Sequence, residues 1–188
     1  VPGKNVFFTW ELSHTAKADS ANNPMDPKRI ARWSNPAGGY IHAMHNMLWG
    51  DMHWLIKGKK ADGRLDMEGG WQNNRPSSMH HLYRMVENVF EELDAPGEWF
   101  YNATEHKLYF MPHAQTNLRT AKVEIVRLKN LIEFNGTKVS PVKNISLQGF
   151  VFRHAARTFM DNKEPLLRSD WTVFRGGAVF FNGAEDCS

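Results

Sequence analysis

The feature that most constrains this fold is a repeat in the C-terminal part of the chain. The segment LIEFNGT at residues 131–137 matches AVFFNGA at residues 178–184, with Phe-Asn-Gly at the same place in both copies. A second match follows each copy, with Asn-Ile-Ser at 144–146 and Asp-Cys-Ser at 186–188. Short strands separated by Asn and Gly turns are typical of a solenoid, in which each turn of chain buries its apolar face by stacking on the next. The repeat therefore predicts parallel strands stacked as rungs over residues 123–188.

The repeat makes two further predictions. Phe134 and Phe181 hold the same position in their copies, so we expect both rings to face a shared core. The second copy stops at Ser188 in the middle of a predicted strand, and solenoid ends are normally capped. We therefore expect more rungs to follow in the whole protein. Two unrelated hairpins with similar turns are the alternative, and their strands would be antiparallel.

Residues 1–122 have a different character and predict an irregular α+β segment. Apolar residues spaced by three and four predict helices over residues 40–49 and, more clearly, over 79–93. Residues 51–57 are predicted as a strand. Aromatic and polar residues alternate over 98–102 and 107–111, which predicts a hairpin with its turn at 103–106.

Composition excludes several classes of protein. The chain has 188 residues, 41% of them hydrophobic, with seven Trp and twelve Phe, so it can bury a core. Its net charge is only +3, and the one tight basic cluster, Lys57, Lys59 and Lys60, is typical of a solvated turn. We therefore expect no nucleic-acid partner. No apolar run is long enough to span a membrane, and the single cysteine, Cys187, cannot form an internal disulfide.

Four segments together carry a family resemblance: RIARWSNP (29–36), YRMVENVFEELDAPGEWF (83–100), KLYFMP (107–112) and NISLQGFVF (144–152). They resemble bacterial right-handed parallel β-helix proteins of the pectate-lyase-like superfamily. The resemblance covers roughly residues 28–188 and is strongest over 83–152. The nearest named relatives are β-helix glycoside hydrolases that include fucosidases and xylanases. The resemblance implies a mainly β fold, in which the α+β segment precedes the start of a right-handed parallel β-helix.

The resemblance also implies a function. It indicates a glycoside hydrolase that is secreted, periplasmic or on the cell surface, needs no cofactor, and has a complex polysaccharide or glycan as its partner. In such enzymes the catalytic acids lie on later rungs, so none is assigned to a residue here and the fragment alone is expected to be inactive. The acids in or near the predicted rungs are Asp161, Glu164, Asp170, Glu185 and Asp186.

Two alternatives stay open within the same fold. A polysaccharide lyase would need a basic proton abstractor, for which Arg153, Arg157 and Arg168 are candidates. A non-catalytic adhesin or glycan-binding solenoid would need neither carboxyl pair nor base. Downstream sequence would separate the three, because a hydrolase needs two carboxyl groups flanking the scissile bond.

Two segments have the side chains that sugars require. Indole rings stack on the apolar faces of pyranose rings, and Asn, Asp, His and Arg bind hydroxyl groups. Such residues gather around 49–54 and in the glycine-flanked loop 70–76, with a His pair just beyond. The candidate substrate-binding residues are Trp49, Asp51, His53, Trp71, Asn73, Arg75, His80 and His81. Ordinary structural packing is the competing explanation for each.

The histidines also raise the question of a metal. His42 and His45 are three residues apart, which would put them on one side of the predicted helix, with Asp51 as a third ligand. The sequence has no His-Glu-x-x-His motif and no cysteine beside them. We therefore predict that the protein binds no metal.

Overall fold

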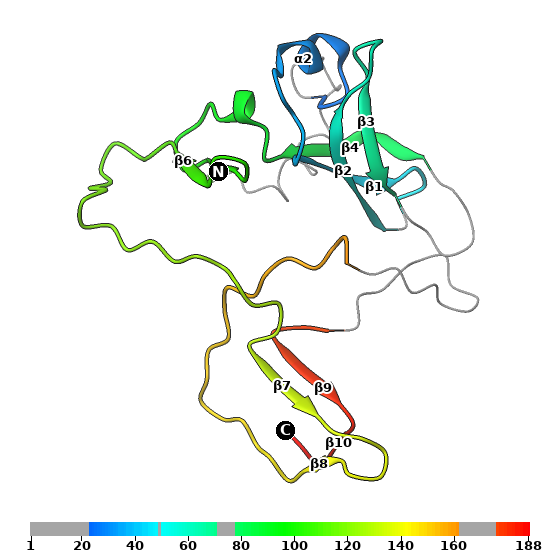
Figure 1. Ribbon diagram of the computed structural model, residues 1–188, viewed down its shortest axis with the longest axis vertical. Helices are drawn as coiled ribbons and strands as arrows, with labels where there is room; N and C mark the ends of the chain where they lie inside the picture. Colours follow the sequence, from blue (N-terminus) through cyan, green and yellow to red (C-terminus); the bar gives the residue numbers. More distant parts are fainter. Residues whose placement is uncertain (1–22, 49, 71–77, 162–175) are drawn as a thin grey trace. The chain divides into compact units, whose positions relative to one another are not determined.

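The structure is a computed structural model that describes residues 23–48, 50–70, 78–161 and 176–188 (Figure 1). It is mainly β, as predicted. Its elements in chain order are α2 (Pro27–Arg32), β1 (Tyr40–His45), β2 (Asp51–Lys59), β3 (Leu65–Gly69), β4 (Met79–Glu87), a 3-10 turn (Phe90–Glu92), β5 (Trp99–Asn102), β6 (Lys107–Phe110), β7 (Ile132–Asn135), β8 (Val142–Lys143), β9 (Val179–Asn182) and β10 (Ala184–Glu185). The described residues up to 121 belong to one compact unit and those from 122 to 161 and from 176 onward to a second.

The first unit contains a four-stranded antiparallel sheet in the order β3-β2-β1-β4. In this register Ile41 lies opposite both Trp54 and Val86, while His42 lies opposite His53 and Met85. Because side chains alternate between the two faces of a strand, the sheet has one apolar face and one face that carries His42 and His53.

The apolar face forms the core of the first unit. Ile41 and Ile56 are fully buried, and α2 adds Ile30 while the residue after it adds Trp33, which is also fully buried. Asp26 caps the start of helix α2, because its carboxylate accepts hydrogen bonds from the backbone N–H groups of Lys28 and Arg29. Pro27 fits the first helical position, where no backbone N–H is needed.

The predicted helix over 79–93 is wrong. Residues 79–87 form β4, which pairs with β1, and only 90–92 make a short 3-10 turn. Asn88 interrupts any longer helix because its φ is 56°, in the left-handed region. The apolar residues whose spacing suggested a helix are divided between strand β4 before Asn88 and the 3-10 turn after it.

The predicted helix over 40–49 is also wrong, since residues 40–45 form β1 at the centre of the sheet. Ile41 and Ala43 are fully buried against β2, so pairing and burial outweigh the helical spacing of the apolar residues. The strand predicted at 51–57 is confirmed as β2, and the turn at 61–63 follows it.

The predicted hairpin is confirmed as β5 and β6, which pair antiparallel from Trp99 opposite Phe110 to Asn102 opposite Lys107. One of its faces packs on the 3-10 turn, because the Phe90 ring makes edge-on contacts with Phe100 and Tyr109 at centroid distances of 5.4 and 5.2 Å. Asn88 also holds the hairpin, since its side-chain oxygen accepts a hydrogen bond from the Tyr101 backbone N–H at 3.0 Å.

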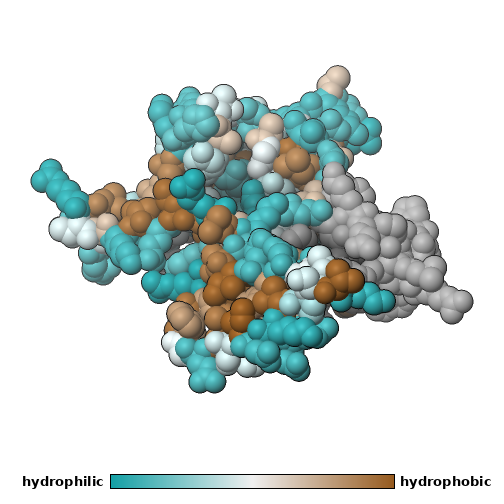
Figure 2. All heavy atoms as spheres, turned by 60° about the horizontal axis from the view of Figure 1, so that its bottom comes forward, coloured by the Kyte–Doolittle hydropathy of each residue, from teal (hydrophilic) through white to brown (hydrophobic). Residues whose placement is uncertain are grey.

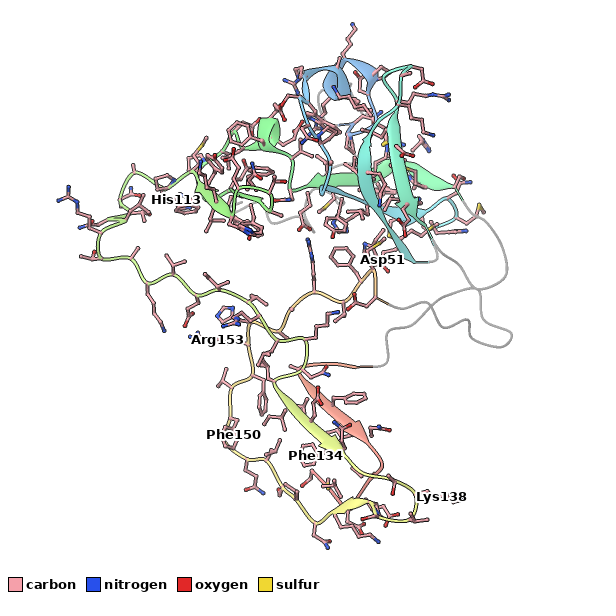
Figure 3. The ribbon with its side chains drawn as sticks, viewed as in Figure 1. Asp51, His113, Phe134, Lys138, Phe150 and Arg153 are labelled. Atoms are coloured by element: carbon pink, nitrogen blue, oxygen red, sulfur yellow. The ribbon has the colours of Figure 1, made fainter. Side chains whose placement is uncertain are left out.

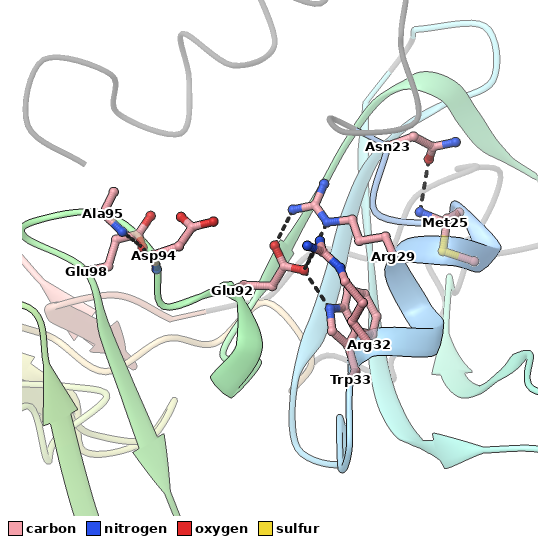
Figure 4. A network of polar contacts seen from close by, with 9 residues as sticks. All are labelled: Asn23, Met25, Arg29, Arg32, Trp33, Glu92, Asp94, Ala95 and Glu98. Atoms are coloured by element: carbon pink, nitrogen blue, oxygen red, sulfur yellow. Dashed lines mark hydrogen bonds and ion pairs between the residues drawn. The ribbon is translucent and has the colours of Figure 1, made fainter.

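A partly buried ion pair fixes the 3-10 turn to α2 (Figure 4). The Glu92 carboxylate accepts hydrogen bonds from two nitrogens of Arg29 and, at 2.6 Å, from the Trp33 indole N–H. Burial tends to raise the pKa of Glu92, but the hydrogen bonds from Arg29 and Trp33 outweigh it and hold the pKa below its ordinary value. The segment 29–36 that resembles the β-helix proteins therefore has a structural role here.

The second unit contains parallel pairs made by the two repeat copies. β7 pairs with β9 in a register that puts Phe134 opposite Phe181 and Asn135 opposite Asn182, and β8 pairs with β10. The Phe134 and Phe181 rings stack with centroids 4.6 Å apart. The prediction of parallel strands with both rings on one face is confirmed. Only Phe134 is buried, however, since Phe181 covers it and is itself 47% exposed.

The copies match in backbone conformation beyond the strands. Asn144 and Asp186, which begin the second matching segment of each copy, both adopt left-handed φ angles, of 59° and 53°. Hydrogen bonds continue past them, from the Leu147 N–H to the Ser188 carbonyl and from the Ser188 N–H to the Ile145 carbonyl. Two stacked layers of chain are thus described, and a complete right-handed β-helix stays a prediction.

Large apolar side chains lie exposed on the second unit, and Figure 2, which turns the lower end of Figure 1 toward the viewer, shows brown surface there. These side chains are Val123, Ile125, Val126, Leu128, Val139, Ile145, Phe150, Val151, Phe152 and Phe181. A stack of two layers leaves such side chains uncovered, because one layer cannot bury its own apolar face.

Candidate functional site

Half of the predicted sugar-binding residues fall within the structure. Asp51 and His53 lie on β2, with Asp51 at its first position (Figure 3), and His80 and His81 lie on β4. The other four, Trp49, Trp71, Asn73 and Arg75, lie outside the described residues. The sheet order places β1 between the two described pairs.

The polar face of the sheet brings Asp51 and His53 into a row of four side chains. The Asp51 carboxylate lies 3.3 Å from Nε2 of His53, and Nδ1 of His53 lies 2.7 Å from Nδ1 of His42. Nε2 of His42 lies 3.0 Å from the Glu87 carboxylate. The row, Asp51–His53–His42–Glu87, thus crosses three strands and ends in a carboxylate at each side.

Burial differs along this row. The His42 side chain is 9% exposed and that of His53 19%, whereas the Asp51 side chain is 67% exposed. The hydrogen bond from His53 is the largest influence on Asp51 and lowers the pKa of its carboxyl group, against a smaller opposing effect of burial. Asp51 is therefore an accessible carboxylate oriented by a histidine, which can accept hydrogen bonds from a ligand's hydroxyl groups.

His80 and His81 lie in a bulge of β4. Ala43 pairs with Arg84 and His45 with Met79, so two steps along β1 face five steps along β4. The buried His80 ring fills this bulge, because its Nδ1 accepts hydrogen bonds from the backbone N–H groups of Leu82 and Tyr83, at 3.0 and 3.1 Å. Bulges commonly redirect side chains beside functional sites.

The environment of His80 fixes its protonation. Burial, and after it the neighbouring His81 and Arg84, lowers the pKa of His80, and its Nδ1 is occupied as an acceptor. The ring is therefore neutral, with its proton on Nε2 as a hydrogen-bond donor. The His80 ring stacks on that of His81 with centroids 4.7 Å apart, and the His81 side chain is exposed.

These residues share one end of the sheet. β1 ends there, and β2 and β4 begin there, because Met44 pairs with Asp51 and His45 with Met79. Backbone hydrogen bonds tie this end together, from the His45 N–H to the Gly50 carbonyl and from the Asn46 N–H to the Ser78 carbonyl. Asp51, His80 and His81 therefore lie at the same end of the sheet.

Over the described residues, no three His, Cys, Asp or Glu side chains come together in a way that could hold a metal ion. The helical spacing of His42 and His45 does not apply, because both lie on strand β1. The prediction that the protein binds no metal or cofactor stays a prediction.

Several acids and bases of the second unit pair with one another. Glu185 pairs with Lys143 at 2.6 Å and Asp161 with Lys129 at 2.5 Å, and Arg153 contacts Glu124 at 3.4 Å. The Arg157 guanidinium lies 5.5 Å from the centre of the Phe159 ring. The other sequence candidates, Glu164, Arg168 and Asp170, lie outside the described residues. None of the described candidates is placed in a catalytic pair.

Sequence analysis missed Glu87 and the role of His42. Both depend on strand pairing, which the helical prediction concealed. Had residues 40–59 been predicted as a hairpin turning at 46–50, His42 would have fallen opposite His53. Glu87 comes to His42 only through the β1–β4 pairing, which joins residues distant in sequence.

Comparison with known proteins gives a match at the level of fold. The chain resembles a solved structure named glycoside hydrolase, with a TM-score of 0.56 and 18% sequence identity. The match covers 76% of this chain and 27% of that structure, so the chain spans about a quarter of the solved protein's length. No protein-family model matches the sequence, and no curated protein matches it either.

The match shows a similarity of fold alone. At 18% identity it carries no statement about residues or substrate. Within the part of the chain that the structure describes, no helix has the length and apolar character needed to cross a membrane.

Proposed function

We propose that this chain is the front part of a secreted β-helix glycoside hydrolase that acts on a complex polysaccharide or glycan. The observation that carries the proposal is the parallel stacking of the two repeat copies, with Phe134 on Phe181. It agrees with the sequence resemblance to β-helix hydrolases, and the fold match to a protein named glycoside hydrolase supports it. The exported location is part of the proposal.

Within this proposal the sugar contacts the end of the sheet that carries Asp51, His80 and His81. Asp51 supplies an oriented carboxylate, His80 and His81 supply ring nitrogens, and the exposed ring of His81 offers a face to a pyranose. Trp49, Trp71, Asn73 and Arg75 remain candidates for the same surface from the sequence alone.

Binding and turnover should separate in this chain. The resemblance puts the catalytic acids on later rungs, and general acid–base catalysis is worth roughly 10²–10⁴-fold. We expect the 188-residue chain to bind oligosaccharides weakly without hydrolysing them. A longer protein that includes the later rungs should hydrolyse the same sugars.

The test is a titration of the chain with a panel of plant and host oligosaccharides. Calorimetry measures binding, and product analysis measures hydrolysis. Asp51→Asn should weaken binding of any sugar that binds by about tenfold, for one lost charged hydrogen bond. His81→Ala should also weaken it, because the ring face offered to the sugar is lost. Asp62→Asn is the matched control, since Asp62 sits in the turn after β2 and bonds to Arg64. If all variants bind the sugar equally well, this end of the sheet is not the binding site. Turnover by the chain alone would contradict the placement of the catalytic acids on later rungs.

A further inference from the structure

An arginine lies on the apolar face of the sheet in the first unit. Arg84 belongs to β4, an edge strand, and pairs with Ala43 of β1, two steps from the pairing of Val86 with Ile41. Residues directly opposite each other share a face, so Arg84 lies on the same face as Ile41 and Val86. A charged group that loses water on such a face normally has a counter-ion beside it.

Arg29 shows how the same unit compensates such a charge. Two of its nitrogens donate hydrogen bonds to the Glu92 carboxylate. Arg84 makes a single hydrogen bond, from its Nε to the side-chain oxygen of Asn23 at 2.9 Å. In the part of the chain that the structure describes, no acid lies within ion-pair distance of Arg84, and its two terminal nitrogens have no hydrogen-bond partner. The guanidinium therefore lacks the anion that Arg29 has.

Asn23 fixes the orientation of this guanidinium. The same Asn23 oxygen accepts a hydrogen bond from the Met25 backbone N–H, also at 2.9 Å (Figure 4). Because one oxygen accepts both bonds, the amide nitrogen of Asn23 remains a donor. The Nε of Arg84 is used for positioning, while its two terminal nitrogens still reach solvent and can donate to a ligand.

The electrostatic surroundings of Arg84 are positive. Burial lowers the pKa of Arg84, and no carboxylate opposes this effect. Burial also lowers the pKa of His80, and the positive charges of His81 and Arg84 lower it further. An anion that reached Arg84 would thus meet an uncompensated positive charge.

We propose that Arg84, oriented by Asn23, binds an oxyanion, the carboxylate or sulfate group of a ligand. The planar guanidinium presents two terminal nitrogens in a fork that matches two oxygens of such a group. An acidic sugar and a free inorganic ion both offer these oxygens. The site needs no neutral sugar, so it stands apart from the proposed function.

Inorganic sulfate is the first probe, titrated by calorimetry at constant ionic strength with chloride as the background anion. The wild type should bind sulfate saturably, and Arg84→Gln should weaken binding by about tenfold or more, because hydrogen bonds from a charged group are lost. Arg84→Lys should recover only part of the affinity, since an ammonium group lacks the fork. Arg127→Gln, which removes an exposed arginine of the second unit, should bind as the wild type does. Equal binding by Arg84→Gln and the wild type, or no saturable binding at all, would overturn the proposal.

Thermal unfolding gives a second measurement with Arg84→Met, which keeps an apolar stem on this face. A ligand that binds only the folded protein raises its Tm. Sulfate also stabilises proteins generally, because it is excluded from their surfaces. The Tm should therefore rise more with sulfate in the wild type than in Arg84→Met. The same rise in both proteins would contradict a specific site.

Oligosaccharides that carry a uronate or sulfate group identify the source of the oxyanion. If they bind through Arg84 more tightly than both sulfate and their neutral counterparts, the oxyanion belongs to a glycan. If sulfate alone binds, the site takes a free ion. Binding of neutral sugars without any binding of sulfate would reject this site and leave the proposed function standing, and binding of sulfate without any sugar would do the reverse.

Discussion

The two units of this chain join strands that are equally distant in sequence, yet only one of these pairings was visible beforehand. Tyr40 pairs with Glu87 in the first unit and Ile132 with Val179 in the second, each 47 residues apart. In the second unit the partners are copies of one motif, so the sequence shows which strand stacks on which. In the first unit the partners are unlike, and nothing local marks them.

The units also differ in what holds their strands. The sheet of the first unit has a buried core on one face, built from Ile41, Trp54 and Trp33. The second unit has Phe134 as its one buried large side chain among the described residues. Its strands are positioned instead by turns in close backbone contact, such as Gly136 against Gly183. Core substitutions should therefore damage the first unit most, and turn substitutions the second.

The largest expected effect is in the core of the first unit. Ile41→Asp places an unpaired carboxylate at a fully buried position, which should cost at least about 3 kcal/mol of unfolding free energy. Val139→Asp, in the second unit at 94% exposure, is the control and should change stability by less than about 0.5 kcal/mol. Urea unfolding followed by tryptophan fluorescence measures both, since Trp33 and Trp54 lie in this core. Equal effects would contradict the assignment of the core.

The next effect is at a turn of the second unit. Gly183 has a φ of 66°, and a Cβ there would lie 2.6 Å from the Gly136 backbone. Gly183→Ala should therefore cost roughly 2–4 kcal/mol, from left-handed strain together with crowding against the neighbouring layer. Gly149→Ala is the matched control, because its φ is 76° with nothing within 4 Å of the added methyl group.

The difference between the two glycine variants isolates the contact between layers. Thermal unfolding followed by circular dichroism in the β region measures both. Similar losses would mean that backbone strain alone matters, and the stacking of the repeat copies would then have no energetic support.

How far sequence predicts this molecule depends on whether a signal is local. The repeat strands, the β5–β6 hairpin and strand β2 each follow from alternation and nearby turn residues, and all three were predicted. Strands β1 and β4 were not, because their apolar residues also fit a helical spacing, and the pairing that decides between the two is distant. The candidate site shows the same division: Asp51 and His53 were found from composition, while Glu87 was not.

The bulge in β4 could not have been predicted from sequence. It depends on His80 Nδ1 accepting from the N–H groups of Leu82 and Tyr83, which satisfies backbone groups that left the β1 ladder. A histidine in an apolar strand pattern gives no indication of such a role. What the sequence does provide is the chemical type of the residue, and only the fold supplies its partners.

A smaller effect tests the attachment of the 3-10 turn. The pKa of Glu92 is held below its ordinary value of 4.5, so the ion pair contributes stability above that pH and loses it as pH falls further. Glu92→Gln should cost about 2 kcal/mol at neutral pH, because Arg29 keeps its charge and loses its partner. The cost should shrink as the pH falls through the lowered pKa of Glu92, because the wild-type carboxylate is then itself protonated. Glu185→Gln, in the exposed pair with Lys143, is the control and should change the free energy of unfolding by less than about 1 kcal/mol, as measured by urea unfolding.

The smallest effect distinguishes strand from helix by its sign. If residues 79–93 formed a helix, Asn88→Ala would stabilise the protein by up to about 0.7 kcal/mol, because alanine favours helices. In the structure Asn88 has a φ of 56° and bonds through its side chain to Tyr101 and Gly38. Asn88→Ala should instead destabilise the protein by about 1–2 kcal/mol, from left-handed strain and the lost hydrogen bonds. Asn88→Gly tolerates the φ angle and loses only the bonds, so its cost should be smaller than that of alanine. If Asn88→Ala stabilised the protein, the helical prediction would be supported after all. If both variants lost the same free energy of unfolding, only the side-chain hydrogen bonds would matter at this position.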